Sequence, residues 1–267
     1  MRTNISENLT EISLNKNLKP LEDEIRLLYL KNQNDIEYLK KLEKMRTQFI
    51  GNVSHELRTP IFNIQGYLET LLDGALEDEK VNRLFLEKAN KNTINLSHLL
   101  NDLIDLSMIE SGEMRMSFRY FNLKDFFDSF VDEYVQLAKH KGLILTICDF
   151  NENIKVFGDK NKLQQVFTNL IQNAIKYTNE GEIKITIEEE AKKVLIKISD
   201  TGIGIPPADI DRIFERFYRV DKARSREVGG TGLGLAIVKH IIEAHHSKIR
   251  VKSELNSGSE FSFILKK

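Results

Sequence analysis

Four segments of the sequence combine residue types that can carry out phosphate chemistry. The first surrounds His55, which lies two residues after Val53 and two before Leu57 in a stretch with apolar residues every three or four positions. At 100° per residue, His55 is turned about 160° to 200° away from both of these apolar positions, so its imidazole should face water. Glu56 is adjacent and Thr59 lies one turn further on. A neutral imidazole can act as a nucleophile beside a carboxylate that holds its proton, although an isolated exposed histidine is usually only a solvated side chain.

The second segment is NLIQNAIKY, in which Asn169, Asn173, Lys176 and Tyr177 recur on roughly one face of a predicted helix. Amide carbonyls can coordinate magnesium, an ammonium group can bind phosphate, and a tyrosine ring can pack against a base or sugar. A polar stripe of this kind is also typical of the solvated face of a helix.

The third and fourth segments are rich in glycine. Asp200 ends a predicted strand and is followed by Gly202 and Gly204, which allow tight turns and the close approach of a flat ligand. Further on, glycines precede a strongly apolar helix, whose first N–H groups can bind an anion. These glycines are Gly229, Gly230, Gly232 and Gly234. Ordinary turns also collect glycine, so either loop alone is compatible with a purely structural role.

Two kinds of structure must position these residues. Apolar spacing predicts one long amphipathic helix over residues 27–72 and a second between Gly74 and Gly112. From Phe118 onward the changing periodicity predicts an α/β sandwich of about 150 residues, so the fold class is α+β. The elements predicted in this half are helices at 123–137, 160–177, 210–217 and after Gly232, and strands at 143–148, 155–158, 181–188, 194–200, 249–253 and 259–265.

The two long helices are expected to pair with a second copy of the chain. Two antiparallel helices with narrow apolar stripes cannot cover each other's apolar faces, and a homodimeric four-helix bundle solves that problem. The alternative is a hairpin packed against its own C-terminal half.

Composition excludes several classes of function. The 267 residues include 39 Lys and Arg against 40 Asp and Glu, so the net charge of -1 gives no bulk attraction to nucleic acid or anionic lipid. Cys148 is the only cysteine, which suits a reducing cytoplasm. No apolar run reaches the roughly 18 to 20 residues of a membrane span, and the polar start lacks the apolar core of a secretory signal. A membrane association is therefore expected only through a possible upstream segment.

Taken together, the motifs resemble those of the sensor histidine kinases of two-component systems, and the chain is similar to the cytoplasmic part of phosphate-sensor-like kinases. The resemblance extends from about Glu43 to the C-terminus and rests on FIGNVSHELRTPI, NLIQNAIKYT, DTGIGIP, IFERFYRVD and GGTGLGLAIVKHI in the order of the family. It implies a signalling helix or linker at 1–42, a dimerisation and histidine phosphotransfer domain at 43–115, and an ATP-binding domain of the gyrase and Hsp90 type at 116–267.

By that resemblance His55 is the phosphoacceptor and Glu56 its acid/base neighbour. Asn173 is the magnesium ligand, and Asp200 receives the adenine amino group. The remaining assignments are Asn169 and Lys176 as phosphate contacts, Tyr177 as a nucleotide-stacking residue, residues 217–229 as a mobile lid with the cations Arg219, Lys222, Arg224 and Arg226, Gly230, Gly232 and Gly234 as its phosphate-binding hinge, and Phe214 and Phe217 as its apolar anchors.

The resemblance implies autophosphorylation of His55 from ATP and Mg²⁺, followed by transfer to an aspartate of a separate response regulator. The pattern His55, Glu56, Thr59 also accompanies regulator phosphatase activity in this family, although Thr59 could instead bond back to its own helix. Two rival functions are an ATP-hydrolysing conformational machine of the gyrase or chaperone type and a non-catalytic scaffold. Asn169 opposes the first, since a neutral amide cannot deprotonate water, and the intact phosphate motifs oppose the second.

Overall fold

The computed structural model describes residues 19–220 and 230–267. Its Cα geometry divides the chain into two compact units, Met1–His55 and Glu56–Lys267, which are treated separately below. This division falls inside a helix and differs from the domain boundaries expected from the sequence at 42/43 and 115/116, which stay predictions. In the described part of the chain, no helix is both long enough and apolar enough to cross a membrane.

The first unit consists, in its described part, of helix α2 (Lys19–Leu72), which continues into the second unit. The helix begins eight residues earlier than the apolar spacing predicts, and it runs through Pro60 without interruption. His55 is exposed while Val53 and Leu57 are partly covered, so the predicted orientation of the imidazole is confirmed. Many apolar side chains of α2 remain exposed, among them Leu27 at 68% and Leu39 at 62%.

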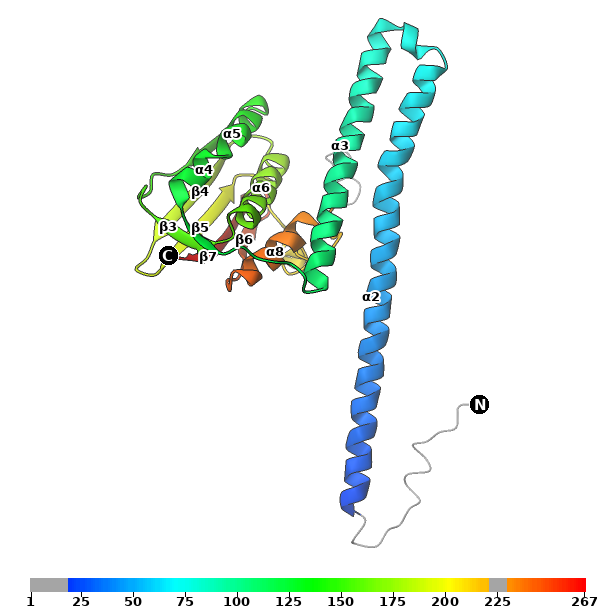
Figure 1. The fold of residues 1–267 in the computed structure, drawn as a ribbon, viewed down its shortest axis with the longest axis vertical. Helices are drawn as coiled ribbons and strands as arrows, with labels where there is room; N and C mark the ends of the chain where they lie inside the picture. The colour runs from blue at the N-terminus through cyan, green and yellow to red at the C-terminus, as the bar shows by residue number, and fades with distance from the viewer. Residues whose placement is uncertain (1–18, 221–229) are drawn as a thin grey trace. The chain divides into compact units, whose positions relative to one another are not determined.

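A helical hairpin opens the second unit (Figure 1). After Gly74, whose φ of +113° favours glycine, a 3-10 helix η1 (Ala75–Glu77) leads into α3 (Glu79–Glu110). The side chain of Asp78 accepts a hydrogen bond from the Lys80 N–H at 2.9 Å and caps α3. Tyr67 and Phe85 join the two helices, with ring centroids 5.5 Å apart. Exposed apolar side chains remain on both helices, as expected for a hairpin that cannot cover its own apolar faces: Phe62, Leu68, Leu84, Leu86 and Ile94.

The rest of the second unit is the predicted α/β sandwich. The strands are β1 (Arg119–Asn122), β2 (Ile144–Ile147), β3 (Lys155–Gly158), β4 (Glu182–Glu189), β5 (Lys193–Asp200), β6 (Arg250–Glu254) and β7 (Gly258–Lys266). All seven form one sheet, in which six follow the order β1-β3-β7-β5-β4-β2 and β6 lies off this path, paired with β7. The β2–β4 pair is parallel and the other pairs are antiparallel. The helices are α4 (Leu123–Asp128), α5 (Val131–His140), α6 (Lys160–Tyr177) and α8 (Gly234–Ala244), together with the 3-10 helix η2 (Pro207–Asp209).

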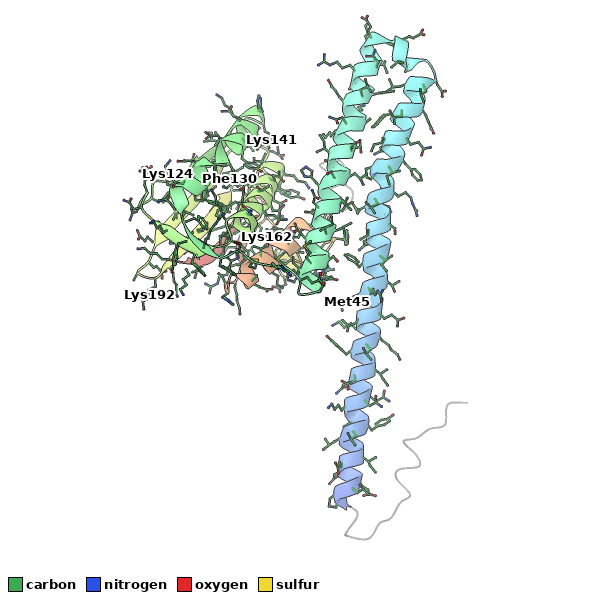
Figure 2. All side chains as sticks on the ribbon, viewed as in Figure 1. Met45, Lys124, Phe130, Lys141, Lys162 and Lys192 are labelled. Atoms are coloured by element: carbon green, nitrogen blue, oxygen red, sulfur yellow. The ribbon has the colours of Figure 1, made fainter. Side chains whose placement is uncertain are left out.

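The core lies between the sheet and its helices. Strand β5 alternates as a half-buried strand should, with Val194, Ile196 and Ile198 buried and the residues between them partly exposed. Aromatic rings fill the space next to them. The ring centroid of Phe167, on α6, lies 5.0 Å from that of Phe127 and 5.7 Å from that of Phe263. Phe130, between α4 and α5 (Figure 2), belongs to the same cluster. This packing holds α6 by its apolar face and leaves its other face for polar residues.

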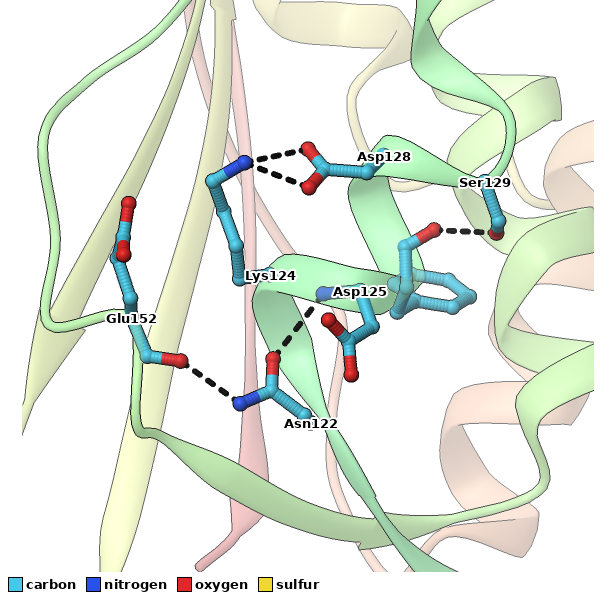
Figure 3. A network of polar contacts seen from close by, with 7 residues as sticks. Asn122, Lys124, Asp125, Asp128, Ser129 and Glu152 are labelled. Atoms are coloured by element: carbon cyan, nitrogen blue, oxygen red, sulfur yellow. Dashed lines mark hydrogen bonds and ion pairs between the residues drawn. The ribbon is translucent and has the colours of Figure 1, made fainter.

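The predicted helix over 123–137 is wrong in one respect, because the chain forms two helices there. The Asn122 side chain accepts from the Asp125 N–H at 3.0 Å and caps α4, while Lys124 pairs with Asp128 one turn later (Figure 3). At its other end the Ser129 hydroxyl donates to the Phe126 carbonyl at 2.6 Å. The helix ends there. The apolar spacing could not reveal this end, because the buried positions of α4 and α5 follow one another at the spacing of a single continuous helix.

Two further expectations differ from the structure. Residues 210–217 form successive turns instead of a helix, since the Arg212 and Glu215 N–H groups bond to carbonyls three residues back. Phe217 ends this segment with φ +59°, a conformation that no helix can continue through. Strand β1 was not anticipated, because it is only four residues long and pairs with β3 over thirty residues further along the chain.

Candidate nucleotide and phosphotransfer site

Helix α6 carries the polar face on which the sequence places four ligand-binding residues. Asp159 starts the helix, and its carboxylate accepts from the Asn161 and Lys162 N–H groups at 3.0 and 3.1 Å. Buried apolar residues hold the helix against the sheet, among them Leu163 and Phe167. The four predicted residues Asn169, Asn173, Lys176 and Tyr177 all lie outside this buried set and are partly exposed. The tertiary fold therefore brings the predicted residues onto one accessible side of the helix.

Asn169 lies against the start of α8. Its Nδ2 donates to the Gly234 carbonyl at 3.5 Å, and a Cβ added at Gly234 would lie 3.2 Å from Asn169 Oδ1. Gly234 is the first residue of α8, and no side chain caps the N-terminus of that helix. Unsatisfied N–H groups at a helix N-terminus favour an anion. The second and fourth sequence segments therefore meet at a helix end that suits phosphate.

Lys176 lies against Gly230, four residues before Gly234 in the same glycine segment. A Cβ added at Gly230, where φ is +123°, would lie 2.5 Å from Lys176 Nζ. The ammonium also lies 4.8 Å from the centroid of the Tyr177 ring. Burial, followed by repulsion from Arg219, lowers the pKa of Lys176 to about 8. A partly buried cation beside a glycine loop is well suited to an anionic ligand, because such a ligand would relieve both effects.

The segment after Asp200 was expected to contain glycines that make room for a ligand. In the structure, these glycines are closely packed against the protein's own backbone. Asp200 accepts a hydrogen bond from the Gly202 N–H at 2.9 Å, and burial raises its pKa. A Cβ at Gly202 would lie 2.5 Å from the Tyr177 carbonyl oxygen, and one at Gly204 would lie 2.0 Å from the Glu254 carbonyl oxygen. Packing of the loop against its own protein is therefore sufficient reason for both glycines. Their role beside a nucleotide stays a prediction.

Gly232 has φ +71°, and its carbonyl accepts from the Phe217 N–H at 2.9 Å. A Cβ there would lie 2.9 Å from the Cα of Phe217. Phe214 packs at right angles on Phe261, with centroids 6.5 Å apart. Both predicted lid anchors therefore contact the sandwich. Of the predicted lid cations, Lys222, Arg224 and Arg226 lie outside the described residues, as does Gly229.

Arg219, which the sequence assigns to the lid over the phosphates, is bonded to another predicted site residue. Its Nη2 donates to Glu56 Oε2 at 2.9 Å, and the two side chains are 14% and 30% exposed. The cation assigned to the phosphates and the carboxylate assigned to proton transfer thus neutralise each other in this structure. Thr59 is exposed on α2, as is His55 in the first unit.

Several polar residues at this site were missed by sequence reasoning. The Thr231 hydroxyl donates to Asp102 of α3 at 3.0 Å and accepts from the Leu233 N–H at 3.1 Å. Burial raises the pKa of Asp102 in spite of that hydrogen bond. Asp105, one turn later, accepts from Lys162 at 2.7 Å and is 19% exposed. In the sequence, the only indication of these contacts was the pair of acids three residues apart, Asp102 and Asp105. Acids at such a spacing are typical of a solvated helix face, so they did not stand out.

The protein side chains at this site suit a magnesium ion that takes only some of its ligands from the protein and the others from a bound substrate and water. Within the described ranges, no group of three or more His, Cys, Asp and Glu side chains could hold a metal ion. Asn173 offers one partly exposed amide oxygen, and no hydrogen-bond partner for it occurs among the described residues. Magnesium is commonly held by one or two protein oxygens together with phosphate oxygens and water, which this arrangement fits.

Comparison with known proteins agrees with this geometry. The model described as "His Kinase A (phospho-acceptor) domain" matches residues 45–112, and that described as "Histidine kinase-, DNA gyrase B-, and HSP90-like ATPase" matches residues 158–267. The chain is 37% identical over 235 residues to the sensor histidine kinase WalK of Bacillus subtilis (strain 168), which covers 86% of this chain and 38% of that protein. It therefore spans less than half of that relative.

Two solved structures are similar along most of the chain. The Acinetobacter baumannii histidine kinase AdeS is 31% identical with a TM-score of 0.64, covering 79% of this chain and 97% of its own. The histidine kinase ThkA in complex with the response regulator protein TrrA is 28% identical with a TM-score of 0.65. The match covers 90% of this chain and 66% of the ThkA chain. The chain therefore belongs to the sensor histidine kinase family, with a phosphoacceptor hairpin followed by an ATPase fold shared with gyrase B and Hsp90.

Proposed function

We propose that this chain binds ATP with Mg²⁺ and transfers the γ-phosphoryl group to its own His55. The observation that carries the proposal is the meeting of α6 with the glycine segment at the uncapped start of α8. There Asn169 lies against Gly234 and Lys176 against Gly230. An amide, a cation and free helix N–H groups thus converge where a polyphosphate could bind.

The nucleotide would occupy the accessible face of α6. Asp200 accepts the adenine amino group, and the Tyr177 ring packs against the nucleotide. Asn173 supplies an amide oxygen to magnesium, and Lys176 binds the phosphates. When bound, the metal neutralises charge on the phosphate oxygens.

The chemical step is an in-line displacement at phosphorus. The lone pair of one imidazole nitrogen of His55 forms the N–P bond while the bond between the γ-phosphorus and the β,γ-bridging oxygen breaks, and ADP leaves. Glu56 takes the proton from the other ring nitrogen, so that the product is a neutral phosphoimidazole ring. For Glu56 to do so, Arg219 must first release its carboxylate, because the pair is bonded at 2.9 Å in this structure. The released guanidinium then becomes available to the transferring phosphate.

The partners follow from the same chemistry. The exposed apolar side chains of the α2–α3 hairpin support a homodimeric four-helix bundle. A phosphohistidine is a phosphoryl donor, and ThkA, a structural relative, is recorded in complex with a response regulator. We therefore assign an aspartate of a separate response regulator as the acceptor. Use of ATP and the single Cys148 suit a cytoplasmic location of these domains.

Labelling with γ-labelled ATP and magnesium tests the proposal. Label should appear on His55 as a phosphoramidate that is lost in mild acid and retained in base, and His55→Gln should abolish it. His98→Gln is the matched control, because His98 is an exposed histidine on the neighbouring helix α3 and should leave labelling intact. Acid-stable label on Ser or Thr, or label that survives His55→Gln, would refute the assignment.

The rival function is an ATP-hydrolysing conformational machine. Asn169 stands where such a machine would need a carboxylate to deprotonate water, and an amide has no such capacity. Free phosphate release should therefore be slow compared with labelling of His55. Steady release that persists undiminished in His55→Gln would favour the rival.

A further inference from the structure

The last turn of α6 ends without the usual glycine cap. Thr178 follows the helix in an extended conformation, with φ -98° and ψ 121°, and its N–H bonds to the Ala174 carbonyl at 3.0 Å. Helices commonly close with a left-handed glycine, whose backbone satisfies the remaining carbonyls. Here the carbonyls of Ile175, Lys176 and Tyr177 need other partners.

Lys141 supplies most of them from a distant part of the chain. It lies directly after α5 (Figure 2). Its Nζ donates to the carbonyls of Ile175 at 2.5 Å, Lys176 at 3.0 Å and Thr178 at 2.8 Å. An ammonium has three N–H donors, so the three carbonyls use all of them. Its charge also faces the negative end of the helix dipole.

The remaining carbonyl is taken by the loop that follows β5. The Ile203 N–H donates to the Tyr177 carbonyl at 3.2 Å, and Ile203 lies between Gly202 and Gly204. Every carbonyl from Ala174 to Thr178 therefore has a partner, and two tethers from outside the helix hold its end. One tether is the Ile203 N–H and the other is the ammonium of Lys141.

We propose that Lys141 is a positioning residue for the nucleotide site, which sets the geometry of the last turn of α6 and with it the side chains of Asn173, Lys176 and Tyr177. The inference rests on the proposed nucleotide-binding function. Lys141 acts through the α6 backbone and does not itself touch the nucleotide. Burial lowers the pKa of Lys141, as expected for an ammonium that has exchanged water for carbonyl oxygens.

The effect of losing Lys141 should be local. The start of α6 is held independently by the Asp159 cap, and its middle is held by buried side chains such as Phe167 and Leu170. Removal of the ammonium should therefore loosen only the final turn, which carries the residues assigned to the phosphates and the base and directly follows Asn173, the residue assigned to the metal. Weaker nucleotide binding should follow, because these groups would have to be ordered when ATP binds.

The test compares Lys141→Met with Lys141→Arg and Lys139→Met in the full chain. Lys139→Met removes the same charge from an exposed position of α5. For Lys141→Met we expect the KM for ATP to rise about three- to tenfold while kcat changes less, since three hydrogen bonds to a charged donor are lost from a binding element. Amide hydrogen exchange should accelerate over residues 174–178 and stay unchanged over 160–167. Lys141→Arg, which keeps a multidentate cation, should restore part of the affinity, and Lys139→Met should behave as the parent protein does.

Asn173→Ala, measured in parallel, separates failure of this inference from failure of the proposed function. If Asn173→Ala weakens ATP binding and Lys141→Met does not, Lys141 has no positioning role. A lowered melting temperature with an unchanged KM for ATP would also overturn the inference, because it would show a purely structural cap. If neither variant alters ATP binding, the nucleotide site itself is assigned to the wrong place.

Discussion

The lowered pKa of Lys176 predicts that ATP binding is coupled to proton uptake. With a pKa of about 8 in the free protein, Lys176 is about three-quarters protonated at pH 7.5 and only about one-tenth protonated at pH 9. A polyphosphate beside the ammonium should return its pKa to the ordinary lysine range near 10.4 or above. The bound state therefore holds the proton at both pH values, whereas most of the free protein has lost it at pH 9.

The size of the effect follows from these fractions. Affinity for Mg-ATP should fall about eightfold between pH 7.5 and 9, which corresponds to about 1.3 kcal/mol, and binding at pH 9 should take up about 0.9 proton. Tyr177 does not interfere in this range, because burial raises its pKa above the ordinary tyrosine value. Calorimetric titration in two buffers of different ionisation enthalpy measures the uptake directly.

Two variants make the coupling specific to Lys176. Lys176→Arg keeps a positive charge that does not titrate below about pH 12, so the uptake should disappear while nucleotide still binds. Lys176→Met should bind more weakly at pH 7.5 and lose the dependence on pH. Equal proton uptake in the parent protein and in Lys176→Arg would refute both the pKa assignment and the placement of Lys176 beside the phosphates.

Three other predictions concern the phosphatase, the nucleotide and the stability of the fold. Thr59→Ala should spare labelling of His55 while slowing dephosphorylation of the regulator, because an exposed hydroxyl one turn from His55 can orient water but has no part in imidazole attack; equal loss of both activities would indicate a distorted helix. Asp200→Asn should reduce affinity for ATP more than for GTP, with an unchanged circular dichroism spectrum, because the amide oxygen would accept from the Gly202 N–H and leave an NH2 group, which cannot accept, for the adenine amino group; equal effects on both nucleotides would contradict that role. Unfolding free energy should fall as the pH drops below about 6.5, because burial lowers the pKa of His245 and the unfolded state then binds more protons than the folded one. Thermal melts at pH 7.5 and 5.5 should show a smaller difference in His245→Gln than in the control His140→Gln.

The His245 prediction has a clear structural cause. Its Nε2 accepts from the Asp159 N–H at 3.0 Å, and its Nδ1 lies 2.7 Å from the Ile241 carbonyl. Only the neutral ring with its hydrogen on Nδ1 satisfies both contacts. Protonation of Nε2 would break the first contact, at the start of the helix that carries the nucleotide residues. Stability is therefore fully present above the ordinary histidine pKa and is lost as the pH falls through the lower pKa of the folded state.

Local patterns in the sequence were sufficient for most of the elements and for the candidate residues. Strand β3 and helix α6 occupy the predicted residues, because turn residues bound them on both sides and their apolar spacing is unambiguous. The exposure of His55 also followed from helical geometry alone. The family resemblance rested on motifs of contiguous residues, which any sequence displays directly.

Tertiary structure alone decided which partners these residues have. The bond between Arg219 and Glu56 spans 163 positions, and Lys141 reaches carbonyls 34 to 37 positions away. Packing against the backbone of Tyr177 and Glu254 proved to require Gly202 and Gly204. Periodicity reports which face of an element is buried, but it carries no information on which distant backbone or side chain meets that face. Those pairings arise only when the sheet order and the packing of the helices are settled, because hydrogen bonds and close contacts depend on distances of a few tenths of an ångström.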